Sequence, residues 1–204
     1  MSDNISNDEQ RVSYGIGRQM GDQLKSSGIP DLDLNLVLAG LRDAFSGQAS
    51  QVEEQAMQAA FQGLQQKMHA AAEETARVAG QAGAQFLEQN GQRDGVVTLA
   101  SGLQYEVISE GSGATPTASS TVRTHYEGTL INGEVFDSSY KRGQPAEFPV
   151  GGVIAGWTEA LQLMKEGAKW RLYIPSDLAY GGRAAGSIPP HSALIFDIEL
   201  LKVL

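Results

Sequence analysis

The sequence predicts an α+β protein in two parts, an all-α N-terminal region with one long helix and an antiparallel sheet packed against a short helix. Residues 31 to 115 contain no proline, whereas six of the seven prolines, both tryptophans and five of the six tyrosines lie from residue 105 onward. Helix interiors tolerate proline poorly, so the proline-free part can be helical and the rest favours strands and loops. We expect a helical dimerisation region over residues 1–50, a long stalk helix over 51–91, a linker over 92–98 and a sheet-forming domain over 99–204.

Two short helices are expected before the long one. Residues 7 to 27 place apolar side chains and glycines three and four apart, from Tyr14 to Leu24, and Gly28-Ile29-Pro30 ends this pattern. A second short pattern begins at Leu32 and ends near Ser46-Gly47. The glycines at 15, 17 and 21 superficially resemble a phosphate-binding loop, but no apolar strand precedes them and their spacing differs, so we expect no nucleotide site.

The long helix carries a narrow apolar stripe with heptad-like spacing. Its members are Met57, Phe61, Leu64, Met68, Ala71, Thr75, Val78, Ala82 and Phe86. A helix of this kind is stabilised chiefly by packing its apolar face against a partner, and the chain offers only two short helices for that purpose. We therefore expect a homodimer formed through the N-terminal helices. A monomeric helical hairpin folded on itself is the alternative.

Composition excludes several classes of function. The net charge is -9, with no basic face, which argues against nucleic-acid binding. The chain has no cysteine, so it forms no disulfide and carries no thiolate chemistry. The N-terminus, MSDNISNDEQR, is polar and acidic, and no run of about 18 apolar residues follows. We therefore expect a cytoplasmic protein that does not bind membranes.

Isolated titratable residues give no sign of a metal or cofactor site. The pairs Glu53-Glu54 and Glu73-Glu74 are typical of a solvated helix surface. His69, His125 and His191 are far apart in sequence, as surface or structural histidines are. We expect no metal and no cofactor.

The C-terminal part shows strand signals, one hairpin turn at Asn132-Gly133 and one short helix. We expect strands from Leu103 to Ile108 and from Val122 to Leu130, and a returning strand from Val135 to Ser138. A helix follows, with Trp157, Leu161 and Met164 on one face, and it ends at Glu166-Gly167. The next strand has Trp170, Leu172 and Ile174 on one face, and a final strand runs from Leu194 to Leu200. The space between sheet and helix is the natural place for a core and a pocket.

Several separated motifs in this part occur together in a known order. They are Tyr126-Glu127-Gly128, Asn132 to Ser139, Val153 to Trp157, Leu178 to Gly181, Ile188 to His191, and Leu194 to Leu201. Residues 99 to 204 therefore resemble the FK506-binding protein family of peptidyl-prolyl isomerases. The helical half, including Ser13 to Gly17, resembles the dimeric bacterial branch of that family, the macrophage-infectivity-potentiator-like proteins.

This resemblance implies a half-wrapped antiparallel sheet around the short helix, with the proline ring of a substrate seated on Trp157. It implies a catalytic group made of Asp137, Tyr180, Trp157, Phe196 and Tyr126. It implies further substrate contacts from Phe136, Arg142, Phe148, Val153, Ile154 and Ile188. In this pattern the backbone N–H of Ile154 and the hydroxyl of Tyr180 offer hydrogen bonds to substrate carbonyls, and Asp137 lies at the rim near Arg142.

Each of these residues also has a plainer interpretation. Taken singly, Trp157 and Tyr180 are better explained by core packing, and Asp137 can equally be an ordinary turn carboxylate. The chain also departs from the family pattern at Ala146, in a shortened link between Phe148 and Val153, and in the loop from Gly182 to Ser187. These departures affect the outer substrate contacts rather than the floor of the pocket.

The implied reaction is rotation about an X-Pro bond, whose barrier is roughly 18 to 20 kcal/mol. We expect such a protein to act on unfolded or partly folded proline-containing chains, to hold clients as a dimeric folding helper, and to bind the macrolides tacrolimus and rapamycin. A non-catalytic module that captures proline-bearing loops and a purely structural chaperone are the alternatives.

Overall fold

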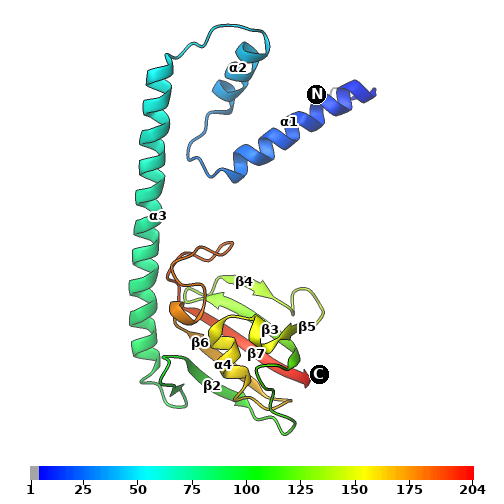
Figure 1. Cartoon of the computed structure of the whole chain (residues 1–204), viewed down its shortest axis with the longest axis vertical. Helices are drawn as coiled ribbons and strands as arrows, with labels where there is room; N and C mark the ends of the chain where they lie inside the picture. The colour runs from blue at the N-terminus through cyan, green and yellow to red at the C-terminus, as the bar shows by residue number, and fades with distance from the viewer. Residues whose placement is uncertain (1–4) are drawn as a thin grey trace. The chain divides into compact units, whose positions relative to one another are not determined.

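The computed structural model describes residues 5–204 of the chain (Figure 1). The chain divides into two compact units, Met1–Phe61 and Gln62–Leu204. The long helix α3 (Glu54–Asn90) begins in the first unit and continues into the second.

The first unit contains two short helices, α1 (Asp8–Ser26) and α2 (Leu34–Phe45). Local sequence explains their starts: Asn7 and Gln10 form a reciprocal capping box before α1, and the Asp33 side chain accepts from the backbone of α2. Their ends are followed by Gly28 and Gly47, both in the left-handed region at φ 66° and 68°. No residue of either helix is buried. Both helices are confirmed, and both leave their apolar faces in solvent.

The second unit contains one antiparallel sheet of seven strands. The strands are β1 (Val97–Thr98), β2 (Gln104–Ser109), β3 (Thr121–Leu130), β4 (Val135–Ser138), β5 (Ala146–Pro149), β6 (Lys169–Ile174) and β7 (Leu194–Val203). Their order is β1-β2-β6-β7-β3-β4, with β5 paired to the first half of β3. The expected sheet around a short helix, α4 (Ala155–Leu161), is confirmed.

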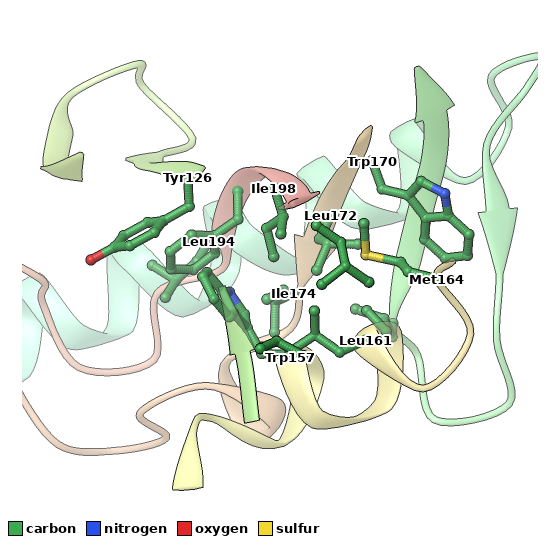
Figure 2. Close-up of a cluster of buried hydrophobic side chains, with 14 of the residues drawn as sticks. Tyr126, Trp157, Leu161, Met164, Trp170, Leu172, Ile174, Leu194 and Ile198 are labelled. Carbon is green, nitrogen blue, oxygen red and sulfur yellow. The ribbon is translucent and has the colours of Figure 1, made fainter. Parts of the chain in front are cut away.

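The core lies between α4 and the inner face of the sheet (Figure 2). Alternation along β3, and along β7 from Leu194 to Leu200, turns every second residue inward, as a strand with one buried face requires. Leu161 of α4 and Leu172 and Ile174 of β6 are completely buried. The sheet thus supplies a rigid support on which a pocket can be built.

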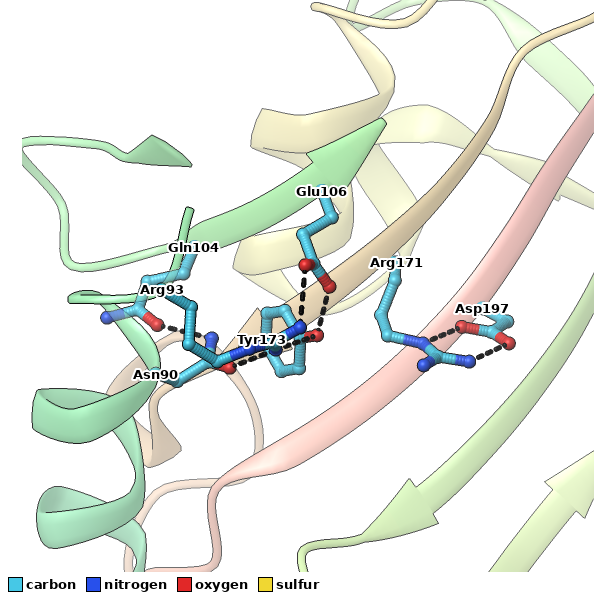
Figure 3. A network of polar contacts seen from close by, with 7 residues as sticks. All are labelled: Asn90, Arg93, Gln104, Glu106, Arg171, Tyr173 and Asp197. Atoms are coloured by element: carbon cyan, nitrogen blue, oxygen red, sulfur yellow. Dashed lines mark hydrogen bonds and ion pairs between the residues drawn. The ribbon is translucent and has the colours of Figure 1, made fainter. Parts of the chain in front are cut away.

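The C-terminal turns of α3 are fastened to the sheet edge by a polar network (Figure 3). The buried Asn90 donates from Nδ2 to Oε1 of Gln104 at 2.8 Å, and Gln104 donates back to the carbonyl of Leu87 at 2.8 Å. Arg93 donates to Glu106 at 2.8 Å, and Glu106 also accepts from Tyr173. These contacts bind the last turn of α3 to β2, and Arg93, just after the helix, also donates to the hydroxyl of Tyr173 in β6 at 3.0 Å.

The structure differs from the sequence expectation at three elements. Helix α4 ends at Leu161 rather than at Glu166-Gly167, because the backbone tightens into a turn in which Leu163 donates to the carbonyl of Ala160 at 2.9 Å, three residues back. That turn still buries Met164, which is why the apolar spacing looked helical. Strand β5 was missed because its few residues include a glutamate and a proline. Strand β1 lies inside the expected linker.

Candidate active site

A cavity of about 720 Å³ opens between α4, the inner face of the sheet and the loop that follows β6. Its walls are mostly apolar and aromatic, with few polar groups, which is typical of a small-ligand site. The residues that line it are Tyr126, Phe136, Asp137, Phe148, Gly152, Val153, Ile154, Trp157, Tyr180, Ala185, Gly186, Ser187, Ile188 and Phe196.

Trp157 is the centre of the aromatic cluster at this cavity. Its ring meets Tyr126, Phe148 and Phe196 edge to face, at centroid distances of 5.2, 5.7 and 5.2 Å. The close approach of α4 to β6 fixes the distance of the indole from the sheet, since a methyl group built on Gly156 would lie 2.6 Å from Cγ2 of Ile174. The indole is therefore held by its neighbours and by the helix start, and it does not need a ligand to stay in place.

Gly128 on β3 makes room for two further rings of the wall. A methyl group built there would lie 2.5 Å from Cε2 of Phe136 and 2.6 Å from Cε1 of Phe196. These two rings meet edge to face at 5.4 Å. Any side chain at position 128 would push them toward the cavity.

A hydrogen-bonded cluster of three side chains lies at the rim. Tyr126 donates from its hydroxyl to Oδ2 of Asp137 at 2.5 Å, and Arg142 donates to the same hydroxyl at 2.7 Å. Arg142 also forms an ion pair with the other carboxylate oxygen of Asp137, and its guanidinium lies 5.5 Å from the centroid of the Tyr126 ring. The carboxylate is thus fixed in orientation at the edge of the pocket.

Electrostatics keep this carboxylate ionised. Partial burial acts to raise the pKa of Asp137, but the hydrogen bonds from Tyr126 and Arg142 outweigh it and hold the pKa below its ordinary value. Burial, together with the hydrogen bond to Asp137, raises the pKa of Tyr126. The rim therefore presents a carboxylate and a neutral phenol at neutral pH.

Ser139 locks the strand that carries this cluster. It is completely buried, and its Oγ accepts from the backbone N–H of Tyr126 at 2.7 Å. Its own N–H donates to the carbonyl of Tyr126 at 2.9 Å. The hydrogen bonds connect the residues after β4 to β3, which keeps Tyr126 and Asp137 at bonding distance.

The comparison with known families decides the identity. Residues 113–201 match the model described as FKBP-type peptidyl-prolyl cis-trans isomerase, and residues 9–107 match the one described as the domain amino terminal to FKBP-type peptidyl-prolyl isomerase. The chain belongs to the FKBP-type peptidyl-prolyl cis-trans isomerase family. The predicted family and enzyme class are confirmed.

Relatives of this isomerase match over nearly its whole length. The FKBP-type 22 kDa peptidyl-prolyl cis-trans isomerase of Escherichia coli is 47% identical over 197 residues, covering 96% of this chain and 96% of the relative. The crystal structure of FkpA from Escherichia coli has a TM-score of 0.71 and 37% identity, and the match covers 98% of each chain. The helical half and the isomerase domain therefore occur together in relatives.

The expected cytoplasmic location is wrong. The Outer membrane protein MIP of Legionella longbeachae is 42% identical over 204 residues, covering 98% of this chain and 87% of the relative. No helix within residues 5–204 is long and apolar enough to cross a membrane. Composition could not have corrected the error, because a chain without cysteine suits either redox compartment.

The structure brings the predicted site residues of the isomerase together. All of them line the cavity except Arg142, which reaches it through Asp137 and Tyr126. Sequence reasoning missed Gly152 and the segment from Ala185 to Ser187, which also form the wall. The segment was recognised only as part of a departure from the family pattern, because an alanine, a glycine and a serine in a loop give no sign of a binding site.

Proposed function

We propose that this isomerase rotates X-Pro bonds in the cavity at Trp157, with the proline ring on the indole. The observation that carries the proposal is the aromatic cavity with one fixed carboxylate at its rim. A planar amide is more dipolar than a twisted one, so an apolar cavity disfavours the planar ground state relative to the rotated state. Lowering the barrier by about 5 to 8 kcal/mol accelerates rotation by roughly four to six decades.

Polar groups of the site then select the rotated geometry. Ile154 is the N-cap of α4, and no loop or cap hydrogen bond within residues 5–204 uses its N–H. This N–H and the hydroxyl of Tyr180, a side chain that is 41% exposed at the cavity, are free to donate to substrate carbonyls. The fixed charge of Asp137 favours one orientation of the amide dipole at no reorganisation cost during the reaction.

The test is a proline-isomerisation assay on a short peptide with the full chain and two conservative variants, Tyr180→Phe and Asp137→Asn. Matched controls come from the outer face of the sheet. Tyr140 donates to Glu199 at 3.2 Å, and Asp197 accepts from Arg171 at 2.6 Å, so Tyr140→Phe and Asp197→Asn make the same chemical changes away from the cavity. We expect the cavity variants to lose kcat/KM and the controls to keep it.

Tacrolimus separates this proposal from its alternatives. A macrolide that fills the cavity should abolish peptide isomerisation by the full chain. A wild-type chain that binds proline peptides without accelerating rotation would establish the non-catalytic binding module. Folding assistance that tacrolimus leaves unchanged, without isomerisation, would establish the structural chaperone.

We further propose that the first unit forms a homodimer through its short helices. Large apolar side chains there are strongly exposed: Phe45 is 94% exposed, Leu36 71% and Tyr14 58%. Exposed apolar surface of this kind marks an interaction site. A dimer would place two cavities on one assembly and raise the local concentration of proline sites on a bound client.

Leu36→Asp combined with Phe45→Asp in the full chain tests the dimer. We expect sedimentation to show a monomer that keeps its activity on short peptides but refolds large clients more slowly. Asn35→Asp is the control, since it adds the same side chain to α2 beside the apolar face. Unchanged mass for the double variant would contradict the dimer, and unchanged client refolding by a monomer would contradict the tethering.

A further inference from the structure

The last turns of α3 pack directly against the segment that follows the cavity wall. A methyl group built on Gly80 would lie 3.3 Å from Cβ of His191, and one built on Gly83 would lie 3.0 Å from Cβ of Ala193. Gly83 and Ala193 are both buried. Figure 1 shows the loop between β6 and β7 beside α3, in agreement with these distances.

This loop is the same one that closes the cavity. Ala185 and Ile188 form an isolated bridge, each donating to the other's carbonyl at 3.0 Å, and both line the cavity. Ile188 is 5% exposed and joins the hydrophobic core. The wall is therefore a short turn held by its own hydrogen bonds, and its position depends on where the two ends of the loop are held.

His191 holds the two ends of the loop. It adopts φ 61°, a left-handed conformation that is unusual for a residue with a side chain. Its N–H donates to the carbonyl of Gly181 at 2.8 Å, which joins the two ends of the loop. On one side its Cβ lies against Gly80, and on the other its ring lies 3.2 Å from a methyl group built on Gly182. The histidine thus lies between the helix and the start of the loop.

The part of α3 that follows this contact is held against the sheet. Asn90 and Leu87 are bonded to Gln104 of β2, and Phe86 packs on Tyr173 of β6 at 5.9 Å. Glycine in a helix interior costs about 1 kcal/mol relative to alanine, so two glycines at this contact weaken the helix locally. The close approach of helix and loop explains their presence, whereas a helix that served only as a spacer would not need them.

We propose that Gly80, Gly83 and His191 are positioning residues of the isomerase. Through these residues, α3 determines the position of the cavity wall from Ala185 to Ile188. The position of that wall in turn determines which residues the enzyme prefers beside the substrate proline. This inference rests on the proposed function, because it assigns the flanking contacts of the same cavity. None of the three residues lines the cavity.

Gly83→Leu in the full chain tests the proposal, with Ala84→Leu as its control. Ala84 is exposed on the same helical turn, so the control adds the same side chain without entering the contact. We expect Gly83→Leu to raise KM for proline tetrapeptides several-fold and unevenly across different residues before proline. We expect little change in kcat, together with shifted backbone amide signals from Gly182 to Ser192. Ala84→Leu should match the wild type.

A compensating pair keeps the test decisive if the leucine variant fails to fold. Gly83→Ala should shift the same loop signals and KM in the same direction, and adding Ala193→Gly should reverse part of both shifts, because it removes the nearest opposing atom while the backbone N of Ala193 stays 3.2 Å away. Unchanged loop signals in folded Gly83 variants would overturn the contact. Shifted loop signals with an unchanged peptide preference would overturn the positioning role. A wild-type chain that does not accelerate isomerisation would instead contradict only the proposed function.

Discussion

The two tryptophans occupy opposite situations in one hydrophobic core. Trp157 is 4% exposed and Trp170 is 6% exposed, and within residues 5–204 neither indole N–H has a hydrogen-bond partner. Trp170 is covered by Tyr105, whose ring stacks on it at 4.2 Å. Trp157 has edge-to-face neighbours instead and lines the cavity. In Figure 2 the hydroxyl of Tyr126 and the indole of Trp170 lie at opposite ends of the labelled cluster.

The difference shows how a core becomes a binding site without losing burial. When another ring stacks face to face on an indole, it covers that face of the indole. Rings that meet the indole edge to face surround it instead and form walls. Both ends of the core keep the chain folded, but only the Trp157 end leaves aromatic surface for a substrate. Changes of equal size at the two ends should therefore cost similar stability and unequal activity.

The largest effect is expected from filling the space at Gly128. Gly128→Ala places a methyl group 2.5 Å from the ring of Phe136 and 2.6 Å from that of Phe196, so we expect both rings to move toward the open cavity that they line. Overpacking of this kind costs about 1 to 3 kcal/mol of unfolding free energy. We expect kcat/KM on peptides to fall at least about tenfold, equivalent to about 1.4 kcal/mol of transition-state stabilisation.

Gly111→Ala is the matched change at the other end. A methyl group there collides with the backbone of Lys165, Glu166 and Ala168, just before β6 and Trp170. It should destabilise the chain in urea unfolding while the folded fraction keeps its kcat/KM. Equal activity losses in the two variants would remove the distinction between the ends.

A smaller effect is expected when each indole is shortened to a phenyl ring. Trp157→Phe removes part of the pocket floor but no hydrogen bond, and Trp170→Phe does the same to the closed end. We expect kcat/KM to fall about three- to tenfold, or about 0.7 to 1.4 kcal/mol, for Trp157→Phe alone. Comparable melting temperatures for the two variants would show that stability does not explain the loss, and equal kcat/KM would contradict the account.

The smallest effect concerns the rim at acid pH. Because the folded-state pKa of Asp137 is lowered, its interactions stabilise the fold above the ordinary carboxyl pKa and are lost as pH falls through the folded value. Arg142→Gln removes one cause of the lowering, so the loss of stability between the unfolded and folded pKa values of Asp137 should be smaller and should end at a higher pH. Thermal unfolding of the wild type and the variant between about pH 2 and pH 5 measures this change in stability. Because the Asp137–Arg142 ion pair is exposed, the change should be only about 0.2 to 1 kcal/mol.

Arg171→Gln is the control for this profile, since Arg171 pairs with Asp197 on the outer face of the sheet. It tests whether removing any arginine shifts the acid decline through net charge. Identical profiles for the two variants would show that the rim has no special role.

Period-two alternation and helical spacing were sufficient to predict most of the fold. They located β3, β7 and the long helix, because each buries one face over many residues. They failed at β5 and at the end of α4, where an edge strand and a tight turn depend on neighbours distant in sequence. The apolar stripe of the long helix, which has only two short helices to cover it, predicted a homodimer, and this stays a prediction; in the structure Phe45 and Leu36 of α2 are exposed.

The pocket was predictable where aromatic residues mark it and unpredictable where small residues form it. Trp157, Phe196 and Tyr126 are carried by motifs, and the structure places all three on one cavity. The wall from Ala185 to Ile188 and its support at Gly83 depend on a contact between segments about a hundred positions apart, which no local pattern encodes.

One measurement tests the central claim most directly. The chain has two tryptophans, so its indole N–H groups give two resolvable NMR signals, which Trp157→Phe assigns. A short proline peptide titrated into the full chain should shift the Trp157 signal and leave the Trp170 signal in place while isomerisation is catalysed. Catalysis with no shift of the Trp157 signal, or with a shift of the Trp170 signal alone, would contradict a proline site on Trp157.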